Sequence, residues 1–437
     1  MRKTTSFILR GILTSLCLGL IFACTAMAQD ALAVKSVKSQ LDQANHLYKC
    51  GQKATFTFTA LGTDGKPLTA GHLLVVFTND NRDKISQQTF DLSKANPVTA
   101  SETMKAPGFM LAKITVTDAT AKKNRVNALA GAGFEPEKIT PGIPEPADFA
   151  QFWADGKKEV RQIPIDVQKK RIDALCNDKI EVFSINFATV NNQRVFGYLS
   201  IPAKGKGPWP TLVMVPGAGP GTGPDLGNVY QGFVCFNMNV FPYEVPIDFK
   251  ERQAVYNKYT SGRHYPRYGM PDRNKMFFRP AYLGIDRAVD WLAEQPYVDA
   301  NRMGVYGSSQ GGGSSLILAG MNKHFKNCVS NVPAICDHNG LLKGRASGWP
   351  HFASSPEDRD MLKAASYMDA VYFASRINCP TKVVVGFIDT TCSPSSVYAA
   401  YNSIRGPKWM IEKTEMGHAG SPEYNQAIEW LKQEISK

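Results

Sequence analysis

The sequence predicts a mostly parallel β-sheet covered by helices, preceded by a smaller β-sandwich. From residue 179 to the C-terminus, short apolar runs alternate with helix-like segments, as expected when helices connect parallel strands. Before residue 128, short strand-like runs separated by turn signals follow one another, which favours an immunoglobulin-like sandwich. We therefore expect a sandwich over residues 29–130, a linker over 131–146 and an α/β domain over 147–437.

The first 28 residues predict an export signal. Basic residues precede an apolar run over residues 12–23, and small residues at 26–28 offer a cleavage site. We expect a mature chain that begins at Gln29 and is exported, to the periplasm or beyond. The alternative is a cut at Cys24 with a lipid tether, which is less favoured because Phe22 is bulky for that motif. No later run is long and apolar enough to predict a membrane span.

Composition excludes some function classes. The formal net charge of +12 includes three charges of the signal, and the other basic residues are scattered, which is typical of a solvated surface and not of a nucleic-acid site. Seven cysteines lie beyond the signal, an odd number with no metal-ligand spacing. We expect no metal and no cofactor, and the spacing dictates no disulfide.

The sandwich region carries no pattern typical of catalysis. Residues 54–60 alternate polar and apolar side chains, as in a half-buried strand, and residues 73–77 and 110–116 predict further strands. A scaffold role and glycan binding both stay open for this part, and we favour the scaffold.

Apolar runs and helical periods mark the elements of the α/β domain. The predicted strands are residues 179–187, 194–201, 210–215, 303–306, 328–333, 381–388 and 408–412, and the predicted helices are residues 148–162, 282–295, 314–319 and 424–435. Residues 243–278 form an irregular, aromatic and basic insertion that we expect at the mouth of the site. Residues 341–368 predict a mobile or helical excursion.

One stretch organises this domain. Residues 307–311 fit G-x-S-x-G, the pattern of a serine at the tip of a tight strand-to-helix turn, with Ser309 at its centre. A strand-like run precedes the motif and a helix-like run follows it, which is the context that the motif requires. The alternative, a Gly/Ser-rich turn without chemistry, is weakened by that context.

A nucleophilic serine needs a base and an acid that orients the base, in the chain order Ser, Asp, His on the α/β-hydrolase fold. Asp389 ends a buried strand, and His418 follows the last strand. Asp389 could instead cap the following helix. The rival histidines are His264, His338 and His351, and the alternative acids are Glu412 and Glu415.

A Gly- and Pro-rich loop over residues 216–224 follows the strand at 210–215. It fits neither the Walker A motif nor the dinucleotide fingerprint. We interpret it as the loop that lends a backbone N–H to an oxyanion hole, with Ala218 as one donor and Gln310 as the second. An irregular surface loop is the alternative.

Several blocks in order resemble family 7 of the carbohydrate esterases, the acetyl xylan esterase/cephalosporin C deacetylase family. The blocks are Ser-Gln-Gly-Gly at 309–312, Arg279, Tyr282 and Arg287-Ala288 before it, Asn-Val-Pro at 331–333, Asp-Thr-Thr-Cys-Ser-Pro-Ser at 389–395, Ala-Ala-Tyr-Asn at 399–402, Pro407-Lys408, Gly417-His418, and Asp-Phe with Phe-Trp within 148–153. The resemblance runs from about residue 146 to the C-terminus.

Three positions depart from the pattern of that family. Residues 216–218 read Pro-Gly-Ala where the family usually has His-Gly-Tyr. Its Arg-Gly-Gln-Gly block is replaced by Phe-Pro-Tyr-Glu at 241–244, and Gly284 stands where its Asp would be.

Together with the predicted export signal, the resemblance implies an exported serine esterase that removes acetyl groups from plant polysaccharide or oligosaccharide through an acyl-enzyme. Ser309 would be the nucleophile, His418 the base and Asp389 the acid. A serine peptidase or other ester hydrolase on the same fold, and a non-catalytic glycan-binding protein, are the alternatives. We expect no nucleic-acid partner, and a homo-oligomer stays open.

Overall fold

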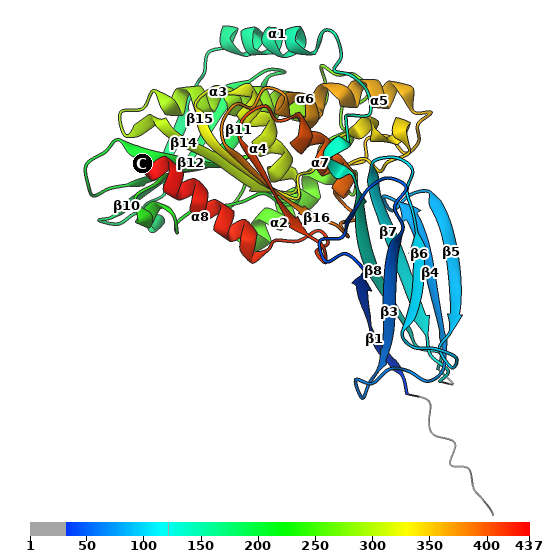
Figure 1. Cartoon of the computed structure of the whole chain (residues 1–437). Helices are drawn as coiled ribbons and strands as arrows, with labels where there is room; N and C mark the ends of the chain where they lie inside the picture. The colour runs from blue at the N-terminus through cyan, green and yellow to red at the C-terminus, as the bar shows by residue number, and fades with distance from the viewer. Residues whose placement is uncertain (1–31, 121) are drawn as a thin grey trace, which may run out of the picture.

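The computed structural model describes residues 32–120 and 122–437 and contains the two bodies seen in Figure 1. The smaller body, in blue and cyan, is a β-sandwich, and the larger one holds a long sheet with its helices. The predicted export signal and Cys24 lie outside the described residues.

The sandwich has a three-stranded sheet in the order β1-β3-β6 and a five-stranded sheet in the order β2-β8-β7-β4-β5. The strands are β1 (Val34–Leu41), β2 (Leu47–Tyr48), β3 (Ala54–Gly62), β4 (His72–Asn79), β5 (Lys84–Asp91), β6 (Val98–Glu102), β7 (Gly108–Thr117) and β8 (Arg125–Phe134). Along β3 every second side chain is buried, and Phe56 packs against Phe77 of β4 between the two sheets. The period-two pattern thus turns one face of the strand into the core.

The larger body is built on a nine-stranded sheet in the order β17-β16-β15-β14-β12-β13-β11-β10-β9. Its strands are β9 (Gln168–Arg171), β10 (Ile180–Thr189), β11 (Gln193–Pro202), β12 (Trp209–Met214), β13 (Val234–Asn239), β14 (Val298–Ser308), β15 (Phe325–Asn331), β16 (Thr381–Gly386) and β17 (Lys408–Lys413). Neighbouring strands from β13 to β17 in this order pair in parallel. The remaining neighbours, β13 with β11, β11 with β10 and β10 with β9, pair antiparallel.

Helices cover the sheet. They are α1 (Phe149–Gln162), α2 (Phe249–Thr260), α3 (Phe278–Ala293), α4 (Gln310–Met321), α5 (Arg359–Ala365), α6 (Ala370–Ala374), α7 (Pro394–Ser403) and α8 (Pro422–Ser436). In Figure 1, α3, α4 and α6 lie above the sheet and α8 runs beneath it. Leu431 of α8 packs so close to Gly304 of β14 that a Cβ on the glycine would lie 2.7 Å from it. This is the α/β-hydrolase arrangement, and the predicted fold class is confirmed.

The structure corrects two details of the prediction and bears out a third. β8 pairs with β7 as far as Phe134, so the predicted boundary at residue 130 falls inside a strand. The small residues at the end of this strand gave it the composition of a linker. The insertion at 243–278 is not wholly irregular, because it contains α2. The segment 341–368 is helical in part, with α5 inside it. Among the described residues, no helix is both long and apolar enough to cross a membrane.

Candidate active site

Ser309 occupies a tight turn between β14 and α4 with φ 58° and ψ −121°, a conformation that non-glycine residues rarely adopt. The glycines on either side make the turn fit. A Cβ on Gly307 would lie 2.4 Å from the carbonyl oxygen of Gly311, and one on Gly311 would lie 2.1 Å from that of Val215. The backbone N–H of Ser309 donates to the carbonyl of Asn331 at 2.9 Å, which fixes the turn against the next strand.

Three side chains far apart in the sequence meet at this turn. Nε2 of His418 lies 2.9 Å from Oγ of Ser309, and Nδ1 of the same ring lies 2.8 Å from Oδ2 of Asp389. The other oxygen of Asp389 accepts the backbone N–H groups of Thr391 at 2.8 Å and Cys392 at 2.9 Å. The carboxylate is therefore buried, hydrogen-bonded and aimed at the imidazole, which is the geometry of a hydrolytic triad.

The other histidines and acids have different partners. His338 is buried, and burial lowers its pKa to about 3. His351 lies 3.3 Å from the hydroxyl of Ser347, and His264 packs edge-on against Trp349 with the ring centroids 5.8 Å apart. The exposed Glu412 accepts a hydrogen bond from Tyr398, and the exposed Glu415 lies in the same loop as His418 without bonding to it. Asp389 is thus the acid that contacts His418.

The predicted oxyanion loop lies beside the nucleophile. A Cβ on Gly217 would lie 3.9 Å from the Cβ of Ser309, and Ala218 next to it is exposed. Gln310 begins α4, so its N–H is among the unpaired donors of the helix N-terminus. The structure places Gly217 and Gln310 beside Ser309, and the roles of the Ala218 and Gln310 N–H groups as oxyanion donors stay a prediction.

Sequence reasoning missed the side chain that fixes this loop. Tyr265, fully buried in the insertion, donates a hydrogen bond to Oε1 of Gln310, and Nε2 of Gln310 donates to the carbonyl of Pro216 at 3.4 Å. An aromatic-rich stretch was the only signal, and a stretch of that kind does not say which ring reaches the elbow.

Comparison with known proteins identifies the family. A family model described as acetyl xylan esterase (AXE1) matches residues 137–434. The chain belongs to the acetyl xylan esterase family. An acetyl esterase, Axe7A of Xylanibacter ruminicola, is 30% identical over 407 residues, which is 90% of this chain and 89% of that protein. That alignment is too long for the α/β domain alone, so it takes in much of the sandwich.

Two solved structures share the fold of this esterase. An acetyl xylan esterase from Paenibacillus sp. R4 aligns with a TM-score of 0.58 and 24% identity over 68% of this chain and 98% of that one. Acetyl xylan esterase 1 from Thermoanaerobacterium sp. JW/SL YS485 aligns with a TM-score of 0.59 and 23% identity over 69% and 98%. The predicted family is confirmed, and the protein is a carboxylic ester hydrolase.

Cys392 adds a thiol to the site of this esterase. Ligand atoms of Asp389, Cys392 and His418 lie within 4.8 Å of one another, a spacing that could hold a metal ion. Both ring nitrogens of His418, however, already face Ser309 and Asp389, and burial raises the pKa of the Cys392 thiol well above its usual value. The donor set fits proton transfer between serine and histidine better than metal binding.

Proposed function

We propose that this esterase removes acetyl groups from acetylated plant saccharides through an acyl-enzyme on Ser309. The observation that supports it most is the unbroken chain of contacts from Oγ of Ser309 through His418 to Asp389, with distances of 2.9 and 2.8 Å. Acetyl esterase activity comes with the family; the saccharide and the residue roles are our proposal.

In the first half-reaction, Oγ of Ser309 attacks the acetyl carbonyl while Nε2 of His418 takes its proton. The N–H groups of Gln310 and Ala218 stabilise the tetrahedral oxyanion. The intermediate then collapses, the bond to the sugar oxygen breaks, and His418 returns the proton to that oxygen. Asp389 holds His418 in the tautomer with its proton on Nδ1 and stabilises the imidazolium.

In the second half-reaction, water attacks the acetyl-Ser309 ester while His418 accepts a proton from it. Collapse of this second intermediate releases acetic acid and restores the serine hydroxyl. The surroundings suit a bulky leaving group. The side chain of His418 is 27% exposed and Ala218 is exposed, so the reacting atoms face an open surface where a polysaccharide could lie.

The test is acetate release from acetylated xylo-oligosaccharides and from 4-nitrophenyl acetate by wild type and S309A. We expect both activities to disappear in S309A. The matched control is S315A, in the same helix, where a buried hydroxyl bonds the carbonyl of Gly311 at 2.8 Å and where we expect activity within about twofold of wild type. Full activity of S309A would place the nucleophile elsewhere.

Other substrates are outcomes of the same assay. A wild type that cleaves bulkier esters or peptides but releases no acetate from saccharide would favour a different ester hydrolase or a peptidase. Saccharide binding without hydrolysis of any ester would favour the glycan-binding alternative.

We also propose that the protein is exported after cleavage behind Ala28. The basic, apolar and small-residue pattern of the first 28 residues supports this. The mass of the N-terminal peptide of the exported protein tests it. A chain that begins at Gln29 agrees with the proposal, whereas a lipid-modified Cys24 would replace it with a tether.

A further inference from the structure

The sandwich contacts the loop that carries Asp389 on the N-terminal side of this residue. Phe387, two residues before Asp389, packs edge-on against Phe109 of β7 with the ring centroids 5.0 Å apart. Gly131 of β8 lies so close that a Cβ there would be 2.5 Å from the carbonyl oxygen of Phe387. Phe109 is only 1% exposed and belongs to the hydrophobic core of the α/β domain, although it comes from the sandwich.

A second contact reaches the same loop on the C-terminal side of Asp389, and it runs through Ala346. Oδ2 of Asp80, in the turn after β4, accepts the backbone N–H of Ala346 at 2.8 Å. The carbonyl of Ala346 accepts the hydroxyl of Ser393 at 2.8 Å. Ser393 caps α7, its hydroxyl accepting the N–H of Ser396, and it is the next residue after Cys392, whose N–H binds Asp389.

The two contacts are joined within the sandwich. The N–H of Asp80 donates to the carbonyl of Phe109 at 2.8 Å, so one rigid corner of the five-stranded sheet carries both residues. Asp80 is 3% exposed, and its φ of 51° is a left-handed conformation. Burial of a carboxyl group in such a place needs compensating partners, and the N–H of Ala346 supplies the partner of Oδ2.

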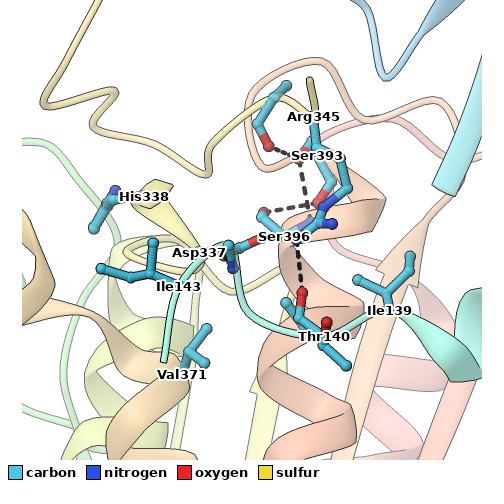
Figure 2. Close-up of polar contacts among 12 residues, drawn as sticks. Ile139, Thr140, Ile143, Asp337, His338, Arg345, Val371, Ser393 and Ser396 are labelled. Carbon is cyan, nitrogen blue, oxygen red and sulfur yellow. Dashed lines mark hydrogen bonds and ion pairs between the residues drawn. The ribbon is translucent and has the colours of Figure 1, made fainter. Parts of the chain in front are cut away.

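The segment from 344 to 346 makes further hydrogen bonds, so Asp80 is not its only contact outside the acid loop. Asn79 donates through Nδ2 to the carbonyl of Gly344 at 2.8 Å. Arg345 is buried and reaches Oδ2 of Asp337 and the carbonyl of Thr140, each at 2.7 Å, as Figure 2 shows. This segment is therefore held in place from two directions, by Thr140 of the linker and by Asn79 at the tip of the sandwich.

We propose that the sandwich positions the catalytic acid of this esterase, with Asp80 and Phe109 as the positioning residues. The inference rests on the proposed role of Asp389 and goes beyond it, because it gives the N-terminal sandwich a part in catalysis. Loss of either contact frees one end of the acid loop, and a displacement of about 1 Å at a catalytic group can lower the rate about a hundredfold.

The first experiment measures kcat and KM for 4-nitrophenyl acetate in D80A, D80N and a control, D118A. We expect D80A to lower kcat about tenfold with little change in KM, as for other residues that orient a reacting group. D80N should recover most of kcat, because the amide oxygen can still accept the N–H of Ala346.

Asp118 is a matched control because it is also a buried aspartate of the sandwich that accepts a backbone N–H, that of Val34 at 2.9 Å. It follows the end of β7 that pairs with His72, whereas Asp80 follows the opposite end of β4. D118A should therefore keep the wild-type kcat per folded molecule. Equal losses in D118A and D80A would overturn the proposal by showing a general effect of destabilisation.

The second experiment repeats D80A in a D389A background. If Asp80 acts through Asp389, its removal should cost less than about twofold there, since residues that act as a unit are not additive. The same tenfold loss in both backgrounds would overturn the proposal. If D80A does not fold, F109L answers the same question, because leucine fills the core but withdraws the ring from Phe387.

The outcomes separate the two proposals. Wild-type kcat in D389A would refute the role of Asp389 and with it the proposed function. Wild-type kcat in D80A and F109L, with D389A inactive, would refute only the positioning role of the sandwich.

Discussion

Ser309 lies between two loops that the protein treats very differently. On the acid side, Asp389 and Cys392 are buried, and the carboxylate takes two backbone N–H groups. On the oxyanion side, residues 217–224 are all partly or fully exposed. Side-chain hydrogen bonds hold the middle of this loop: the N–H of Thr222 donates to Oδ1 of Asn239 at 2.8 Å, and Nδ2 of Asn239 donates back to the carbonyl of Thr222 at 3.2 Å.

The difference divides the labour of the site. An acid that never touches substrate gains by being fixed in advance, because each hydrogen bond that is already made costs no reorganisation during the reaction. The open side must admit a saccharide of variable shape, so exposure there is useful. Variants of the buried groups that fix the acid or the oxyanion donors should therefore change kcat, whereas variants of the exposed surface around Ser309 should change KM or substrate choice.

The largest effect is expected for D389N. The amide oxygen can keep the N–H groups of Thr391 and Cys392, but its NH₂ would then face Nδ1 of His418 and force the wrong tautomer. We expect kcat for 4-nitrophenyl acetate to fall about 10⁴-fold with the fold intact by circular dichroism. E412Q is the matched control, because Glu412 bonds Tyr398 and not His418. A loss of kcat in E412Q as large as that in D389N would show that the assignment of the acid role to Asp389 is wrong.

The second prediction concerns stability on the acid side. Burial raises the pKa of Asp80 from 3.8 to about 7, against the opposing effects of the N–H of Ala346 and of Arg345. Because folding raises this pKa, the stabilisation by protonated Asp80 is complete below pH 3.8 and is lost progressively as the pH rises from there to about 7.

D80N cannot ionise, so it should gain stability relative to wild type between pH 4 and pH 7, by up to roughly 4 kcal/mol. Urea unfolding of both proteins at several pH values measures the gain. The pKa of Asp369, raised by burial to about 8, acts in both proteins and cancels. A constant difference across this range would mean that Asp80 is already ionised in the folded protein.

The third prediction moves to the oxyanion side. Y265F removes the hydroxyl that holds Gln310, which in turn reaches the carbonyl of Pro216. We expect kcat to fall about tenfold, because a slack loop no longer presents its N–H where the oxyanion forms. Y256F is the control, a neighbouring ring 6.1 Å from Tyr265. Unchanged kcat in Y265F would show that the loop is fixed without this bond.

The local motifs of the site and its long-range contacts differ in how far the sequence could predict them. The elbow and the triad are marked by local signals, namely glycines at fixed spacing, buried runs of strand length and the order of three residues. The bond between Asp80 and Ala346 joins residues 266 positions apart, and no local pattern encodes it. The hydroxyl of Tyr265 was equally hidden, since one tyrosine in an aromatic insertion resembles the next until the chain is folded.

The smallest effect is expected at the exposed surface of the site. The N–H of Trp349 donates to the carbonyl of Thr391 at 3.2 Å, which places its half-exposed side chain beside the acid loop. The indole packs against Tyr265 with the ring centroids 6.3 Å apart. A partly exposed indole beside the acid loop suits contact with the apolar face of a sugar ring.

We expect W349A to raise KM for acetylated xylo-oligosaccharide about fivefold, a change of roughly 1 kcal/mol, and to leave KM for 4-nitrophenyl acetate near the wild-type value. The small ester reaches Ser309 without a sugar to stack, so only the saccharide should detect the missing ring. An equal rise for both substrates would mean that Trp349 supports the site as a whole. The exposed surface would then be as much a part of the catalytic framework as the buried acid loop, and the assignment of different roles to buried and exposed groups would be wrong.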